Sequence, residues 1–196
     1  MISIANVLRN AAVAALAATA VVLPTSAGVA SAAPAGNAAV AVTTAPALTP
    51  AAKAHMAKAR KAVCVNAHVQ NIGWQGWQCG RSGWPVEVGT TGQSLRLEAL
   101  LISTRKTGGI CAQAHVQNVG WQRIRCARDN RPVMVGTVGQ SLRLEALRLN
   151  AGSRICAQAH VENIGWQRWS CNRRSWPATV GTVGQSLRLE ALRVRV

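Results

Sequence analysis

The chain contains one sequence motif three times, and this internal repetition constrains its fold more than any other feature. The copies begin at Cys64, Cys111 and Cys156, and the second reads CAQAHVQNVGWQRIRCARDNRPVMVGTVGQSLRLEAL. The central tryptophans of successive copies are 47 and 45 residues apart, and the difference lies in the connectors, because no residue is inserted or deleted inside the motif. Such a pattern indicates one supersecondary unit that is stacked or arranged about an axis.

The repeat region is expected to be a single all-β domain, residues 62–196, made of units at about 62–108, 109–153 and 154–196. Short alternating runs are punctuated by Gly and Thr, and helix signals are weak. Four short strands in each of three units predict a pseudo-threefold β-prism-like fold, with three sheets around a tryptophan-rich axis. A β-trefoil is the alternative. A linear array is less favourable, because three small units stabilise one another poorly without closure.

The N-terminal residues 1–32 have the pattern of a secretory signal peptide. Arg9 precedes an apolar run, and the small residues Ala-Ser-Ala at 30–32 offer a cleavage site. The run is shorter than the roughly 20 apolar residues that a transmembrane helix needs, and Pro24 interrupts it. We therefore expect a secreted, extracellular protein without a transmembrane segment, either free in solution or associated with a cell surface.

The next segment, residues 33–61, is expected to be a disordered linker. It consists mainly of Ala, Pro, Thr and Lys and has almost no large apolar side chain, so that it buries too little surface to offset the entropy of ordering. A short helix from Ala51 to Val63 is the alternative, since the residues there are good helix formers.

The formal net charge is +16, and it comes mostly from arginine. The arginines are dispersed along the sequence rather than gathered into a cluster. Dispersal and secretion both argue against a nucleic-acid partner. They leave wall polymers, phospholipid surfaces and acidic glycans as the anionic partners to consider.

Each motif holds two cysteines that are 15 residues apart. In an exported protein we expect one disulfide within each motif: Cys64–Cys79, Cys111–Cys126 and Cys156–Cys171. A loop of this size contributes about 3 kcal/mol in the chain-entropy model. A metal site is the rival interpretation, but there is no CxxC pair, and no cofactor is expected.

The predicted disulfide also sets a hairpin register with its turn at Asn71-Ile72. In this register Val69 and the other apolar residues of the first strand share a face with Trp74, while His68 lies on the opposite face. A glycine bulge at Gly73 would shift the register by one residue. We therefore interpret the constant tryptophans as core residues, and stacking on a sugar is their alternative role: Trp74, Trp121 and Trp166.

The constant histidines and glutamates of the motif are expected to be structural. The histidines, predicted on the outer face, are also candidate ligand-binding residues: His68, His115 and His160. Glu98 and its copies each lie two residues from an arginine on the same face of a predicted strand, Leu95–Leu100 and its counterparts. Repeated ion pairs explain this pattern better than the paired carboxylates of a glycosidase. We therefore do not expect an enzyme.

Positions that vary between the copies are the better candidates for ligand binding. Trp84 and Trp176 precede a proline in a predicted loop where the second copy has Arg131, and Trp77 and Trp169 are also expected on the outside. Exposed tryptophans suit stacking against a pyranose ring. The alternative is that each covers a small apolar cluster or a disulfide.

Two stretches carry a resemblance to a known family: A-H-V-Q-N-x-G-W, and then G-T-x-G-Q-S-L-R-L-E-A-L. Together they resemble the clostridial hydrophobic repeat with a constant tryptophan, the ChW family, over residues 64–196. The resemblance implies extracellular repeats on a secreted bacterial protein, with a role in adhesion or glycan binding. The six cysteines depart from the family pattern.

We therefore expect a secreted, non-catalytic module that binds a carbohydrate or an anionic cell-wall polymer, in a lectin-like or adhesive role. Two alternatives remain. One is a secreted module that binds or inhibits an extracellular protein through its loop tryptophans and arginines. The other is a cationic protein that acts on envelopes, for which binding would depend strongly on salt.

Overall fold

A computed structural model describes residues 45–174 and 176–196, so the predicted signal peptide lies outside the described residues. Within these ranges the chain forms one helix, α1 (Pro50–Lys58), and fifteen strands. No helix among the described residues is long and apolar enough to span a bilayer. The strands are β1 (Ala62–Val69), β2 (Gly73–Trp74), β3 (Gln78–Arg81), β4 (Val86–Gly89), β5 (Leu97–Arg105), β6 (Ile110–Val116), β7 (Gly120–Trp121), β8 (Arg125–Ala127), β9 (Val133–Gly136), β10 (Leu144–Ala151), β11 (Cys156–Val161), β12 (Gly165–Trp166), β13 (Ser170–Cys171), β14 (Ala178–Gly181) and β15 (Leu189–Arg195).

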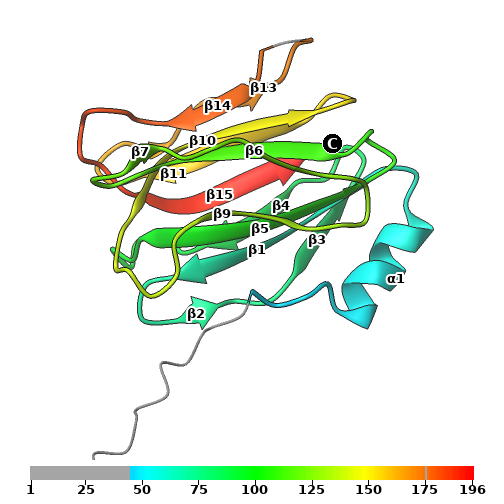
Figure 1. Ribbon diagram of the computed structural model, residues 1–196, viewed down its shortest axis with the longest axis horizontal. Helices are drawn as coiled ribbons and strands as arrows, with labels where there is room; N and C mark the ends of the chain where they lie inside the picture. Colours follow the sequence, from blue (N-terminus) through cyan, green and yellow to red (C-terminus); the bar gives the residue numbers. More distant parts are fainter. Residues whose placement is uncertain (1–44, 175) are drawn as a thin grey trace, which may run out of the picture. The chain divides into compact units, whose positions relative to one another are not determined.

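The strands form three antiparallel five-stranded sheets, one for each repeat (Figure 1). The first has the order β2-β1-β5-β9, with β3 also paired to β1; the second has β14-β10-β6-β7 with β8; the third has β12-β11-β15-β4 with β13. Each sheet thus takes one strand from another repeat: β9 joins the first, β14 the second and β4 the third. This cyclic exchange closes the ring of repeats, and the predicted β-prism is confirmed.

The core between the sheets is aliphatic. Alternate residues of β1, Val63, Val65, Ala67 and Val69, are fully buried, as are their counterparts in the other two repeats. Aliphatic side chains from the long strands β5, β10 and β15 and from the short exchanged strands β4, β9 and β14 fill the rest of this cluster. The predicted tryptophan-rich axis is therefore wrong, since no tryptophan belongs to the buried core of the described residues.

A one-residue register shift explains where the constant tryptophan lies. Cys64 pairs with Cys79, as predicted, but nearer the turn His68 pairs with Trp74. The segment between β2 and β3 holds one residue more than its partner strand, so the disulfide register does not extend to the turn. Trp74 consequently faces outward beside His68 and is only half-buried, as are its counterparts. The prediction that these are core residues is therefore wrong: Trp74, Trp121 and Trp166.

A second irregularity changes which residues of the long strand face the core. β5 pairs with β1 through His68–Ala99 and then Val69–Leu97, so that Glu98 occupies a bulge. Beyond the bulge Leu100 and Ile102 face the core, and the strict alternation predicted from Leu95 does not hold. The strand begins at Leu97 and runs to Arg105. Bulges of this kind re-aim a side chain, and here Glu98 turns toward His68.

A glycine lets each exchanged strand cross into the neighbouring sheet. Gly136 has φ 92°, and a Cβ there would lie 2.3 Å from the carbonyl oxygen of Glu98. The residue after the constant tryptophan secures the same point, because Gln122 accepts a hydrogen bond from the Gly136 N–H at 2.8 Å and donates one to its carbonyl at 3.1 Å. Gln75–Gly89 and Gln167–Gly181 repeat this arrangement.

Part of the predicted linker is structured. Thr49 caps α1 by accepting a hydrogen bond from the Ala52 N–H at 3.2 Å, and Pro50 starts the helix. Leu48, Ala52 and Met56 are buried in a small cluster with Ala62 and Cys64 of β1. The linker prediction is therefore wrong for residues 45–61. This segment folds because the first repeat offers it an apolar surface, which linker composition alone does not reveal.

All three predicted disulfides are present, each within its own repeat: Cys64–Cys79, Cys111–Cys126 and Cys156–Cys171. Each joins the first long strand of a repeat to the short strand beside it, close to the end where the repeats are connected.

Candidate ligand-binding surface

The prism has two ends of different chemistry. At the connector end, the chain passes from one repeat to the next at 105–109 and 151–154, and the loops that start at Arg81, Arg128 and Asn172 lie beside these connectors. At the opposite turn end lie the hairpin tips 70–72, 117–119 and 162–164, and the glycine-containing turns that follow β4, β9 and β14.

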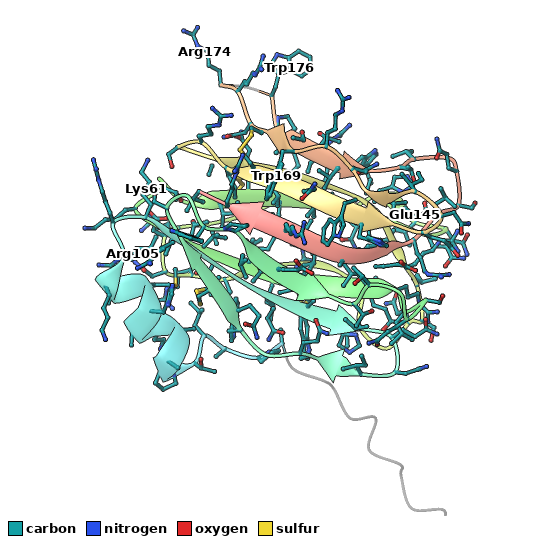
Figure 2. The ribbon with its side chains drawn as sticks, turned by 180° about the vertical axis from the view of Figure 1, so that it is seen from behind. Lys61, Arg105, Glu145, Trp169, Arg174 and Trp176 are labelled. Atoms are coloured by element: carbon teal, nitrogen blue, oxygen red, sulfur yellow. A yellow bond between two sulfur atoms is a disulfide. The ribbon has the colours of Figure 1, made fainter. Side chains whose placement is uncertain are left out.

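Positive charge gathers at the connector end. Its basic residues, none of which pairs with a carboxylate among the described residues, are Arg60, Lys61, Arg81, Arg105, Lys106, Arg128, Arg131, Arg154, Arg173, Arg174 and Arg195. Figure 2 shows Lys61, Arg105 and Arg174 toward one end and Glu145 toward the other. The arginines are dispersed in the sequence but not in the fold, because the antiparallel topology returns every connector to the same end.

The glutamates of the described chain are all engaged elsewhere. Arg96 pairs with Glu98 at 2.8 Å, and the two other repeats have the equivalent pairs Arg143–Glu145 and Arg188–Glu190. The predicted repeated ion pairs are therefore confirmed. Two further pairs use the remaining glutamates, Arg188–Glu162 and Arg193–Glu87. Asp129, at the connector end, is the one acidic side chain of the described residues that forms no ion pair.

Asp129 neutralises one side of the connector end. Burial by itself would raise the pKa of this carboxyl, but hydrogen bonds from the side chain and N–H of Thr107, the Gly108 N–H and the Thr104 hydroxyl outweigh it and lower the pKa. The carboxylate is therefore charged at neutral pH and fixed against the first connector, between repeats 1 and 2.

A hollow of about 1120 Å³ lies at the connector end between repeats 2 and 3. Arginines from both sides line it: Arg128 follows the Cys111–Cys126 disulfide, Arg154 lies in the second connector, and Arg173 and Arg174 follow Cys171. The rest of its wall comes from the two disulfides, polar side chains and Trp169. The hollow is large enough for a ligand of several sugar rings.

Trp169 is the one predicted aromatic candidate that lines this hollow. It is half-buried, and the guanidinium of Arg195 lies 4.4 Å from its ring centroid. Arg154 reaches into the same region, where its Nη2 lies 3.4 Å from the Cys171 sulfur.

The predicted loop candidates are brought to the connector end. Trp84 is 65% exposed and Trp176 is 77% exposed, the largest values for any tryptophan among the described residues. Two backbone hydrogen bonds between Arg173 and Trp176, of 2.9 and 2.7 Å, hold the loop that carries Trp176, which stands clear of the sheets in Figure 2. Arg131, the residue that replaces these tryptophans in repeat 2, is also exposed.

Trp77 is not available to a ligand. Its indole N–H donates a hydrogen bond of 2.9 Å to the carbonyl oxygen of Ala47, and its ring packs with the cluster under α1. Trp77, Ile124 and Trp169 are equivalent positions of the three repeats. In repeat 1, α1 covers the surface that is open at Trp169 in repeat 3. Trp77 therefore has the alternative role of covering a small apolar cluster, to which Cys64 belongs.

The constant histidines are fixed within their own repeats. His68 Nδ1 lies 3.1 Å from Glu98 Oε2, and the imidazole meets the Trp74 ring edge-on at 5.3 Å between centroids. The same contacts are made by His115 with Glu145 and Trp121, and by His160 with Glu190 and Trp166. These side chains have few free positions for a ligand. Among the described residues, no group of three His, Cys, Asp or Glu side chains is placed to hold a metal ion.

Sequence reasoning did not single out the arginines of the hollow. Arg128 and Arg173 each lie two residues after the second cysteine of a repeat, and Arg154 lies two residues before the first cysteine of repeat 3. A predicted disulfide marks the strand end near the connectors. Counting charges next to each cysteine would therefore have located these residues.

Comparison with known proteins identifies the repeats. The family model described as "Clostridial hydrophobic W", or ChW, matches residues 68–105, 115–151 and 160–196. Each match begins at a constant histidine and contains the tryptophan, the glycine-containing turn and the long final strand, while the first cysteine of each pair precedes it. No curated protein and no solved structure matches the chain. Because the three matches cover more than half of it, the chain belongs to the ChW repeat family.

Proposed function

We propose that this protein is a secreted, non-catalytic module that binds an anionic polysaccharide of the cell wall through its connector end. The observation that carries the proposal is the joint placement of unpaired arginines and exposed tryptophans at that end. Trp84 and Trp176 offer open ring faces beside Arg81 and Arg173.

The two kinds of side chain have complementary roles in recognising such a polymer. Tryptophan rings stack on the apolar faces of sugar rings at little cost in conformational entropy. Guanidinium groups form paired hydrogen bonds to carboxylate or phosphate groups. A neutral glycan would use the tryptophans alone, whereas an acidic one would use both.

The placement of the carboxylates supports a role without catalysis. A retaining or inverting glycosidase needs two carboxyl groups about 5 to 10 Å apart at one substrate. Here each constant glutamate is held by an arginine and lies beside a histidine of its own repeat, as Glu145 is by Arg143 and His115. Asp129 is saturated by hydrogen bonds. The three disulfides support export, since structural disulfides persist in oxidising compartments.

The test is co-sedimentation of the protein with purified cell walls and with insoluble neutral and acidic polysaccharides, at low and at high salt. We expect binding to walls and acidic polysaccharides that weakens but persists at high salt. The variant Trp84→Ala with Trp176→Ala should lose this salt-resistant part, whereas Ile124→Ala, which removes an exposed apolar side chain from the middle repeat, should bind like the original protein.

Two results would contradict the proposal. Equal binding to every anionic surface at low salt, with none at high salt, would mean that the arginines act only through their charge. Duplex DNA that displaces the protein from walls as well as soluble acidic glycan does would mean that the surface does not recognise sugar.

A further inference from the structure

We infer that the connector end holds one specific oxyanion site per molecule, in the hollow between repeats 2 and 3. This inference rests on the proposed function and names the group of the polysaccharide that is recognised. The ligand is a saccharide unit that bears a carboxylate or a phosphodiester, with its charged oxygens between Arg154 and Arg173.

The wall of the hollow is basic on both sides, and no Asp or Glu is among the described residues that line it. Asp129 follows Arg128 outside this lining, and its carboxylate is held by the Gly108 N–H at the rim. Arg128 approaches from repeat 2, Arg154 from the connector, and Arg173 and Arg174 from repeat 3. All four side chains are exposed, and none forms an ion pair with a carboxylate among the described residues. An oxyanion in the hollow would be attracted from several directions.

The structure holds the arginine-bearing segments in place without a ligand. Asn172 donates hydrogen bonds to Asn150, Ala151 and Ser153 and accepts one from the Ile155 N–H, which ties repeat 3 to the second connector. The contact between Arg154 and the Cys171 sulfur and the backbone pair between Arg173 and Trp176 hold the two sides. Such pre-organisation lowers the entropy lost on binding.

The equivalent position between repeats 1 and 2 cannot take an anion. Asp129 there lies three residues after the second cysteine, where repeat 3 has Arg174. Its carboxylate already receives the hydrogen bonds of Thr104, Thr107 and Gly108, so the protein supplies its own anion at this boundary.

The third boundary, between repeats 3 and 1, is nearly closed. The Gly83 N–H donates a hydrogen bond of 3.1 Å to the Val196 carbonyl oxygen. The space that remains is about 320 Å³, and the arginines among the described residues that line it are Arg154 and Arg195. Since the guanidinium of Arg195 lies over Trp169, this boundary lacks the opposed arginines of the hollow. Three similar repeats therefore yield one site.

Isothermal titration calorimetry tests the inference on the disulfide-bonded chain. The probes are a short oligogalacturonate, which supplies carboxylates, and a short glycerol-phosphate oligomer, which supplies phosphodiesters; a neutral oligosaccharide of similar length is the control. We expect one site per molecule for at least one acidic probe, and the probe that binds identifies the source of the oxyanion.

Two matched double variants separate the hollow from the general charge. Arg154→Ala with Arg173→Ala removes two charges from the hollow, whereas Arg81→Ala with Arg131→Ala removes two exposed charges at the same end but outside it. We expect the first to weaken binding about tenfold or more, because charge-assisted hydrogen bonds are lost, and the second about twofold. Because all four arginines are exposed, both variants should fold, and thermal unfolding checks this.

The possible failures are distinguishable. Equal weakening by the two double variants, or three sites per molecule, would overturn the single site while leaving the proposed function intact. If neither acidic probe binds the original protein, and walls do not sediment it either, then both the site and the proposed function are wrong.

Discussion

Replacing Gly136 with alanine should destabilise the protein far more than replacing Gly139, which lies three residues later. Both glycines have a positive φ, 92° and 73°. The Cβ of an alanine at 136 would lie 2.3 Å from the Glu98 carbonyl oxygen and 2.7 Å from the Ala99 Cα, whereas a Cβ at 139 would meet nothing within 4 Å. Gly139 is therefore a matched control for backbone strain.

The magnitudes follow from these contacts. The left-handed conformation costs an alanine about 1–2 kcal/mol at either position. At 136 the close contact would also push β9 from β5 and break the two hydrogen bonds with Gln122, which contribute about 1 kcal/mol each. We expect a loss of about 3–5 kcal/mol for Gly136→Ala and about 1–2 kcal/mol for Gly139→Ala.

Equilibrium urea unfolding, followed by tryptophan fluorescence, measures both losses. The larger one is a substantial part of the roughly 5–15 kcal/mol stability of a single domain, and it should lower the melting temperature by about 10 °C. Equal losses at the two positions would refute the reasoning, since strand exchange into the neighbouring sheet would then not depend on the close approach at Gly136.

Three further predictions concern the connector end and α1. Asp129→Asn should reduce the free energy of unfolding by about 1–2 kcal/mol at neutral pH. The pKa of Asp129 is lowered in the folded protein, so the stability difference between the variant and the original protein should be constant above about pH 5. It should shrink as the pH falls below the unfolded pKa of about 3.9 toward the lowered folded pKa, and urea unfolding across this range measures it. Cys111→Ser with Cys126→Ser should cost about 3 kcal/mol by loss of loop-closure entropy, and a melting temperature unchanged under non-reducing conditions would contradict this. Met56→Ala should lower the free energy of unfolding by about 2–3 kcal/mol, because this fully buried side chain holds α1 on repeat 1. The same variant should increase the quenching of Trp77 fluorescence by acrylamide, and Lys53→Ala, at an exposed position of α1, is the control.

The sequence was sufficient to predict the architecture and the covalent framework. An insertion-free motif present three times requires three similar units, and closure follows because isolated units of this size are unstable. The disulfides follow from one cysteine pair per unit, and the Arg96–Glu98 pair follows from two charges on one side of a strand. Each of these inferences depends on local spacing alone.

The register and the location of the site could not be predicted in the same way. The extra residue between β2 and β3 reverses the direction of Trp74, and the bulge at Glu98 reverses the faces beyond it. Such single-residue shifts leave no trace in hydrophobic alternation, because one slip exchanges the two faces of a strand. The location of the hollow depends on which connectors and loops meet in space. The sequence of a single unit does not contain this information.

Comparison of the three copies with one another supports placing the function at the connector end. At the turn end they are nearly identical: the segment from the glycine-containing turn through the final Leu-Arg-Leu-Glu-Ala-Leu differs only at Thr91, where the other two copies have valine. At the connector end the copies diverge in charge and size. Three positions illustrate this: Ala62, Gly109 and Arg154; Ser82, Asp129 and Arg174; and Trp84, Arg131 and Trp176.

This difference has a physical reading. The turn end contains the glycine–glutamine contacts and the ion pairs that every repeat needs to close the ring, so one solution serves all three copies. At the connector end the contacts differ from copy to copy, as Gly109, with φ 88°, and Asn172 illustrate. There the first copy offers an apolar surface to α1, the second contributes Asp129, and the third contributes the arginines of the hollow. A fold with threefold pseudosymmetry thus presents a surface with none, which is what the proposed single site requires.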